Sequence, residues 1–124
     1  MKNRVLEGPL SDGEAIEVIN IDFDIDSLLI TVQIDGYKID IEFDCPAGYR
    51  VLDEGDLLEF WPSCSSGNGW LYEILEGGWL YQERLRKGFL SLSNSEVKEY
   101  FIIGCNYCVG VFAWEDPSVC ESIR

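Results

Sequence analysis

The stretch INIDFDIDSLLITVQIDGYKIDIEFD, residues 19–44, decides the fold. Apolar residues alternate with polar, mostly acidic, residues through three successive runs, which is the period of a strand with one buried face. Asp35-Gly36, between the second and third runs, is a strong signal for a two-residue type I′ hairpin turn, because both turn positions need a positive φ. The stretch therefore predicts a three-stranded antiparallel meander with one apolar and one acidic face.

Two turns define the expected pairing of these strands. Closing the chain at Asp35-Gly36 pairs apolar residues only: Ile34 with Tyr37, Val32 with Ile39, Ile30 with Ile41 and Leu28 with Phe43. A turn at Asp26-Ser27 does the same for the first two strands: Ile25 with Leu28, Phe23 with Ile30, Ile21 with Val32 and Ile19 with Ile34. Because a slip of one residue would turn the apolar side chains to solvent, we expect both registers to be strongly specified.

Further short runs of strand-forming residues follow. They span residues 49–52, 57–61, 70–75, 79–85, 97–103 and 107–114. The runs 70–75 and 79–85 form a candidate hairpin whose register stays open, and a short helix over 82–87 is an alternative. Both faces of the last two runs are apolar, which is typical of strands in the middle of a fold. The remaining segments are expected to be a loop at 7–14, a linker at 90–95 and a short tail at 118–124.

Eight or nine short strands in 124 residues predict one all-β or strongly β-rich domain, residues 1–124. Most connections are short enough for hairpins, so antiparallel pairing should dominate. We expect an antiparallel meander and hairpins that form a sandwich or a partly closed barrel.

The chain is strongly acidic. It has 23 Asp and Glu against 9 Lys and Arg, a net charge of −14, and residues 1–60 hold 15 of the acidic and 4 of the basic residues. This charge repels nucleic acids and anionic membranes, so neither is an expected partner. A basic protein is the natural partner, and a purely solubilising role for the charge is the alternative.

Residues 1–10 lack the apolar core of a secretory signal, and no apolar run approaches the roughly 18–20 residues that span a bilayer. The five cysteines are an odd number, which argues against a full set of disulfides. Together these features predict a cytoplasmic protein with free thiols.

Motifs for catalysis and metal binding are missing from the sequence. There is no histidine to act as a general base, and no G-x-S-x-G. The D-x-D-x-D run at residues 22–26 opens like a calcium loop, but Ser27 and Gln33 stand where that loop needs glycine and glutamate. Cys105 and Cys108 have no second C-x-x-C to complete a zinc site. We therefore expect neither an enzyme nor a bound metal or cofactor.

The acidic side of the meander is the candidate partner-binding surface. Its residues in the expected register are Asp22 and Asp24 on the first strand, Leu29 and Thr31 on the second, and Asp40 and Glu42 on the third. Lys38 is its only base. Acidic flanks around a less polar centre suit docking onto a basic cleft. We expect Asp24 and Asp40 to be surface positions, where charge reversal weakens binding without disturbing the fold.

Aromatic residues leave other functions open. Most of the 4 Trp, 6 Tyr and 6 Phe are expected to fill the core. Trp61 and Trp70, at the ends of the small-residue loop 62–69, could line a binding surface. A small-ligand-binding β-barrel with an aromatic-lined pocket and a non-catalytic adaptor subunit are therefore the alternatives.

The segments GGWLYQERLRKGFL, residues 77–90, and EYFIIGCNYCVGVFAWEDP, residues 99–117, resemble the later part of small β-rich immunity proteins. Such proteins accompany bacterial polymorphic toxins, including contact-dependent growth-inhibition systems. The resemblance lies in size and hairpin layout. It implies a cytoplasmic, non-enzymatic protein that binds a cognate toxin domain, often a nuclease with a basic cleft, and blocks it. It assigns no interface residues.

Overall fold

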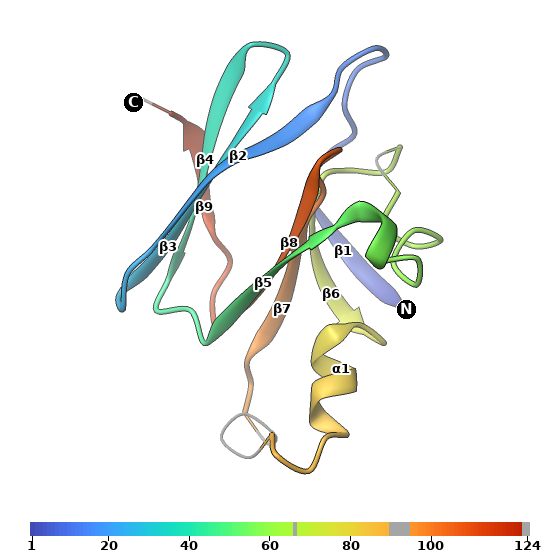
Figure 1. Cartoon of the computed structure of the whole chain (residues 1–124), viewed down its shortest axis with the longest axis vertical. Coiled ribbons are helices and arrows are strands. Elements are labelled where there is room, and N and C mark those ends of the chain that lie inside the picture. Colours follow the sequence, from blue (N-terminus) through green and yellow to red (C-terminus); the bar gives the residue numbers. More distant parts are fainter. Residues whose placement is uncertain (66, 90–94, 123–124) are drawn as a thin grey trace.

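In the computed structural model, two antiparallel β-sheets pack face to face (Figure 1). The structure describes residues 1–65, 67–89 and 95–122. Its elements are β1 (Lys2–Glu7), β2 (Ile16–Phe23), β3 (Ser27–Ile34), β4 (Tyr37–Asp44), β5 (Gly48–Asp53), the 3₁₀ turn η1 (Glu54–Asp56), β6 (Leu71–Glu76), α1 (Trp79–Arg84), β7 (Lys98–Ile102), β8 (Tyr107–Ala113) and β9 (Ser118–Glu121). Sheet A has the strand order β1-β6-β7-β8-β5, and sheet B the order β2-β3-β4-β9. Of the two predicted architectures, the protein has the sandwich.

The β3–β4 hairpin has the predicted register. Every pair expected from the Asp35-Gly36 turn is present, from Ile34 with Tyr37 to Leu28 with Phe43. The turn has φ values of 48° and 88°, the two positive angles that a type I′ turn requires. The inward side chains are fully buried: Leu28, Ile30, Val32, Ile41 and Phe43.

The predicted register of β2 is wrong. The observed pairs are Ile16 with Ile34, Val18 with Val32, Ile21 with Ile30 and Phe23 with Leu28. The chain turns over residues 24–27 because the Asp24 carboxylate accepts hydrogen bonds from the N–H groups of Asp26 and Ser27, at 2.8 and 3.0 Å. This wider turn leaves Ile25, a predicted core residue, 89% exposed.

A β-bulge between Val18 and Asn20 changes the β2–β3 pairing a second time, beyond the change made by the wider turn. Without this extra residue, the pairing set by Ile21 would place Glu17 opposite Ile34 on the buried face, at the cost of burying a charge. The bulge instead directs Val18 inward and leaves Ile19, another predicted core residue, 40% exposed. The first strand of the meander therefore presents apolar side chains to solvent.

β7 is the middle strand of sheet A, between β6 and β8. Its side chains are buried on both sides of the sheet: Tyr100 and Ile102 pack into the core between the sheets, whereas Phe101 stacks on Phe60 at 4.6 Å between ring centroids. This confirms the prediction that the doubly apolar C-terminal runs form central strands.

Three other segments correct the sequence-based expectations. Residues 57–61 form turns that pack on the outer face of sheet A, not a strand. Residues 79–84 form α1 in place of the second strand of a hairpin; the alternative helix over 82–87 overlaps only the last three of these residues. Residues 118–121 form β9, which pairs with β4, in place of a tail. β1, which no sequence pattern indicated, pairs with β6. The predicted linker at 90–95 lies outside the described residues apart from its last position.

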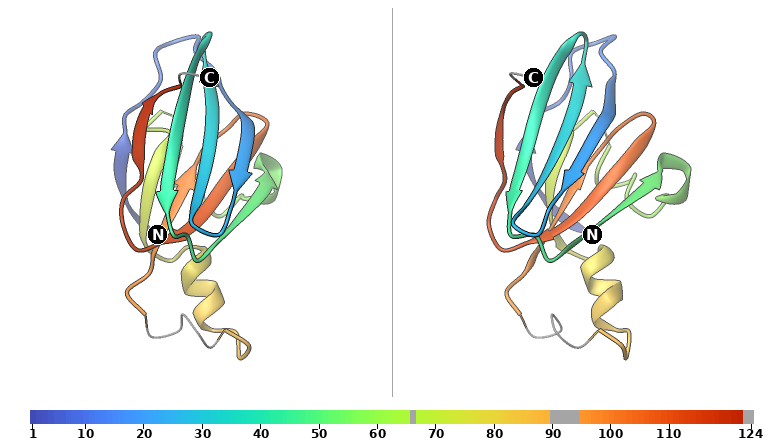
Figure 2. Two further views of the ribbon diagram at one scale, coloured as in Figure 1. Left: turned by 90° about the vertical axis from the view of Figure 1, so that its left-hand side faces the viewer. Right: turned by 60° about the vertical axis from the view of Figure 1, so that its left-hand side comes forward.

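Asn106, in the β7–β8 turn, ties the two sheets together. Its amide accepts a hydrogen bond from the Val18 N–H at 3.1 Å and donates one to the Val18 carbonyl at 2.9 Å. The Cys105 N–H also donates to the Ile16 carbonyl, at 2.8 Å. These bonds satisfy part of the free backbone edge of β2. They hold β2 on the side of the sandwich where β8 and β5 lie (Figure 2).

Candidate functional site

The outer face of sheet B carries most of the predicted binding residues. In the left-hand view of Figure 2, β9, β4, β3 and β2 lie side by side with this face toward the viewer. Cross-strand pairs arrange its side chains in three rows: Asp22, Leu29, Glu42 and Ser118; Asn20, Thr31, Asp40 and Cys120; and Glu17, Gln33 and Lys38. We call these three rows the acidic face.

The first row brings three predicted residues together. Asp22 and Glu42 are exposed and flank the half-buried Leu29. Neither carboxylate has an ion-pair partner among the described residues, whose ion pairs involve Lys2, Arg4 and Arg86 instead. Acidic side chains that share one face repel one another, so a positively charged partner would relieve this repulsion.

The other three predicted residues are placed differently. Thr31 and Asp40 form a buried pair, in which the Thr31 hydroxyl donates a hydrogen bond of 2.7 Å to the Asp40 carboxylate. Asp40 is only 9% exposed, so the expectation that it is a surface position is wrong. Asp24 is exposed but lies in the β2–β3 turn, where its carboxylate binds backbone N–H groups. Charge changes that probe this face therefore belong at Asp22 and Glu42.

An apolar groove of about 230 Å³ runs beside the acidic face, between the edge strands β2 and β5. It is lined by Val18, Ile19, Asn20, Ile21, Val51 and Tyr107. The groove exists because the bulge exposes Ile19 and because Asn106 holds β2 near sheet A. At the far end of β2 the Phe23 ring lies 5.4 Å from that of Tyr49, and both rings are partly exposed. We call this surface the β2–β5 groove.

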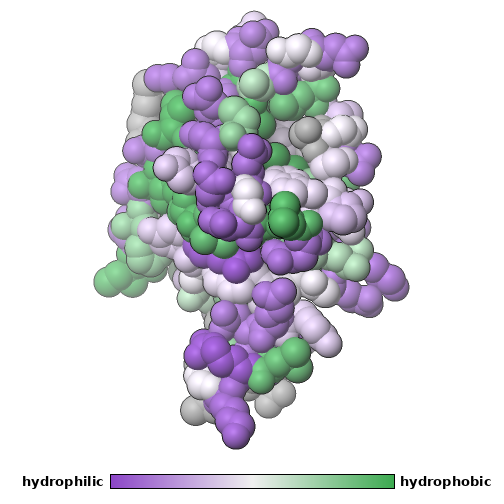
Figure 3. Space-filling model, turned by 45° about the vertical axis from the view of Figure 1, so that its right-hand side comes forward, coloured by the Kyte–Doolittle hydropathy of each residue, from purple (hydrophilic) through white to green (hydrophobic). Residues whose placement is uncertain are grey.

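Sequence reasoning missed the β2–β5 groove, since its walls come from both sheets. Figure 3 shows hydrophobic residues exposed toward its left-hand margin, the side that β2 and β5 occupy, while hydrophilic residues cover most of the face in view. Apolar surface that stays exposed beside a charged face is typical of protein-binding sites. Val18 and Ile19 are adjacent apolar residues, which a regular strand cannot both turn inward, and this break in the alternation is the signal that could have revealed it.

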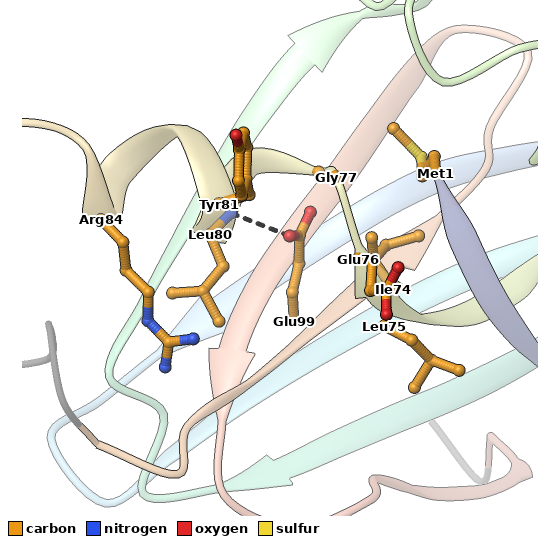
Figure 4. A pocket seen from close by; sticks show the side chains of 10 residues that line it. Met1, Ile74, Leu75, Glu76, Gly77, Leu80, Tyr81, Arg84 and Glu99 are labelled. Atoms are coloured by element: carbon orange, nitrogen blue, oxygen red, sulfur yellow. Dashed lines mark hydrogen bonds between the residues drawn. The ribbon is translucent and has the colours of Figure 1, made fainter.

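A different pocket, of about 420 Å³, lies beside α1 and has Glu99 in its wall (Figure 4). Glu99 projects from the central strand β7 and is 2% exposed. Its carboxylate accepts hydrogen bonds from the N–H groups of Trp79, at 3.1 Å, and Leu80, at 2.8 Å. A Cβ at Gly78 would lie 2.7 Å from this carboxylate, so glycine is needed there. Glu99 therefore accounts for the start of α1 at this point of the chain.

Removing the Glu99 side chain should destabilise the fold. Glu99→Ala leaves a buried and a partly buried N–H group without the acceptor they have now, and we expect a loss of about 2–4 kcal/mol in the free energy of unfolding. Urea denaturation measures this loss. Glu96→Ala, at an exposed glutamate three residues away, is the matched control and should cost less than about 0.5 kcal/mol.

The same comparison should depend on pH. Burial raises the pKa of Glu99 above its ordinary value of 4.5, while the two N–H donors and the charge of Arg50 oppose the rise. A raised folded-state pKa means that the stabilisation from this group is fully present below the unfolded pKa and is lost as pH rises through the folded pKa. The stability difference between wild type and Glu99→Ala should therefore narrow as pH rises, and a widening difference would contradict this assignment.

The cysteines and tryptophans singled out in the sequence have distinct environments. The five cysteines are free; Cys64 and Cys108 are buried, and burial raises the pKa of Cys64 to about 11. Trp70 lies in the core between the sheets, whereas the half-buried Trp61 lines a pocket. Across residues 1–65, 67–89 and 95–122, no group of three or more His, Cys, Asp and Glu is arranged to hold a metal ion. No helix in this part of the chain is long and apolar enough to cross a bilayer.

Comparison of the chain with protein-family models, curated proteins and solved structures found no match.

Proposed function

We propose that this protein is a non-enzymatic immunity protein that binds a basic toxin domain in the cytoplasm and blocks its active site or the access of its substrate. The row Asp22–Leu29–Glu42 carries the proposal, because it sets two exposed carboxylates, neither ion-paired within the described part of the chain, on either side of an apolar side chain. A nuclease toxin presents a basic cleft to the phosphates of its substrate. An acidic face competes with nucleic acid for such a cleft.

The acidic face and the β2–β5 groove supply different parts of the binding energy. Exposed charges mainly accelerate association by long-range attraction, which salt screens. Apolar surface in the groove, released from water on binding, slows dissociation. The two surfaces share β2, so one partner can cover both at once.

Co-expression with a candidate toxin domain, taken from the genes next to that of this chain, tests the proposal. Cells that produce both proteins should survive, and the two should co-purify as a complex. An unrelated acidic protein with a net charge near −14 is the control for charge alone and should not protect. Loss of viability despite folded protein, or equal protection by the control, would exclude the proposed function.

A further inference from the structure

A second pocket, of about 400 Å³, opens at the end of the sandwich from which the β7–β8 turn projects. Three segments that are distant in sequence form it: the loop before β2, the segment from η1 to Ser65, and the residues that follow β7. We call it the Trp61 pocket. It shares no described lining residue with the β2–β5 groove.

Part of the wall of the Trp61 pocket is apolar and held in place by packing and a hydrogen bond. Ile16 and Ile103 contribute buried side chains, each packed into one of the hydrophobic cores. The Trp61 indole N–H donates a hydrogen bond of 3.0 Å to the Glu54 carbonyl, and its ring lies 6.1 Å from that of Phe101. An indole fixed in this way offers a preformed aromatic wall, which costs little to order when a ligand binds.

The charged residues among the described lining of the Trp61 pocket are acidic. Glu14 and Glu54 line it, and its described lining residues include no lysine or arginine. The Glu14 carboxylate accepts a hydrogen bond of 2.6 Å from the Ser11 N–H, and the Glu14 N–H donates one of 3.0 Å to the Ser11 carbonyl. These two bonds fix the loop that carries this carboxylate. Two glutamates and an indole therefore line one pocket, and negative charge together with an aromatic ring favours a cation and disfavours an anion.

From this combination we infer that the Trp61 pocket binds an organic cation with a flat or aliphatic body: a guanidinium, amidinium or alkylammonium group. The body of the ligand contacts Ile16, Ile103 and the Trp61 ring, and its charge lies near Glu14 and Glu54. Such a group belongs either to a free small molecule or to an arginine or lysine side chain of a protein. The inference is independent of the proposed toxin partner, because it concerns a different set of residues.

Comparing three planar ligands of matched shape distinguishes the contribution of charge to binding from that of hydrophobic contact. Benzamidine is a cation, benzamide is neutral and benzoate is an anion. In a two-dimensional ¹⁵N NMR titration of the wild-type protein, benzamidine should shift the Trp61 indole N–H signal and leave those of Trp70, Trp79 and Trp114 in place. We expect benzamide to bind at least about fivefold more weakly than benzamidine, and benzoate not to bind.

Variants test which residues provide the selectivity. The double variant Glu14→Gln, Glu54→Gln should reduce the ratio of the affinities for benzamidine and benzamide by a factor of at least about five. The control Glu115→Gln, at an exposed glutamate outside the pocket, should leave this ratio unchanged. Acetyl-Gly-Arg-Gly-amide tests the protein source of the cation. Tighter binding of this peptide than of benzamidine assigns the pocket to an arginine side chain, and the reverse assigns it to a small molecule.

Three results would overturn the inference. One is equal binding of the three planar ligands, which would leave only an apolar pocket. Another is the absence of any Trp61 shift with benzamidine and peptide up to about 20 mM, where even weak ligands of this size bind. The third is a preference for the cation that survives the double glutamine variant. None of these results bears on survival in the co-expression test, so the two proposals fail separately.

Discussion

Val32→Asp should cost about 4 kcal/mol or more of the free energy of unfolding, a large part of the 5–15 kcal/mol typical of a domain. Val32 is fully buried at the centre of sheet B, between Val18 of β2 and Ile39 of β4. A carboxylate there would have no cation to pair with in the apolar core around it. Urea denaturation should show an unfolded or nearly unfolded chain. Val32→Ala should remain folded, with a loss of about 2 kcal/mol from the cavity.

Gln33→Asp is the matched control for this prediction. Gln33 is the next residue along β3, is exposed, and lies on the acidic face beside Lys38. We expect a change within about 0.5 kcal/mol. Thr31→Asp is not a neutral control, because Thr31 is buried against Asp40 and the new carboxylate would face a like charge. Equal losses at positions 32 and 33 would contradict the assignment of inner and outer faces.

Reversing charge at Asp22 and Glu42 should have the largest effect on binding. In the double variant Asp22→Lys, Glu42→Lys, both exposed flanks of Leu29 become basic, so attraction to a basic partner turns into repulsion. We expect the dissociation constant of the complex with the proposed toxin partner to rise about 10- to 100-fold, measured by calorimetry. The melting temperature should change little, because both side chains are exposed.

A second double variant separates position from total charge. Glu59→Lys with Glu96→Lys changes the net charge by the same amount at exposed sites outside the acidic face. This variant should weaken the complex by less than about threefold, since charges beyond a Debye length are screened. Equal weakening by the two double variants would mean that the complex responds to net charge and not to this face.

The sequence predicted those parts of the fold that depend on neighbouring residues. The β3–β4 hairpin follows from Asp35-Gly36, because the turn geometry and the alternation of apolar residues favour the same register. At the other end of β3 the turn geometry and the alternation of apolar residues favour different registers. The Asp24 side chain stabilises a wider turn, and the bulge at Ile19 then restores the buried face further along β2. Neither effect can be read from the period of the sequence alone.

Features set by distant residues were missed. The helix α1 begins where Glu99, twenty residues further along the chain, accepts two of its N–H groups, so the local pattern, which left a strand over 79–85 and a helix over 82–87 as alternatives, could not place its start. The β2–β5 groove requires Val51 and Tyr107 of sheet A to meet β2 of sheet B. The burial of Asp40 beside Thr31 likewise depends on tertiary structure. Asp22, Leu29 and Glu42 remain from the predicted site as one continuous row.

The rate constant for association with the proposed toxin domain, measured against salt concentration, tests most directly whether the acidic face docks onto a basic partner. For the wild-type protein this rate should fall steeply between about 50 and 500 mM NaCl, as the attraction is screened. The variant Asp22→Lys, Glu42→Lys should associate more slowly at low salt and lose most of the salt dependence. Its dissociation rate should change much less. Equal association rates for the two proteins at every salt concentration would contradict the account.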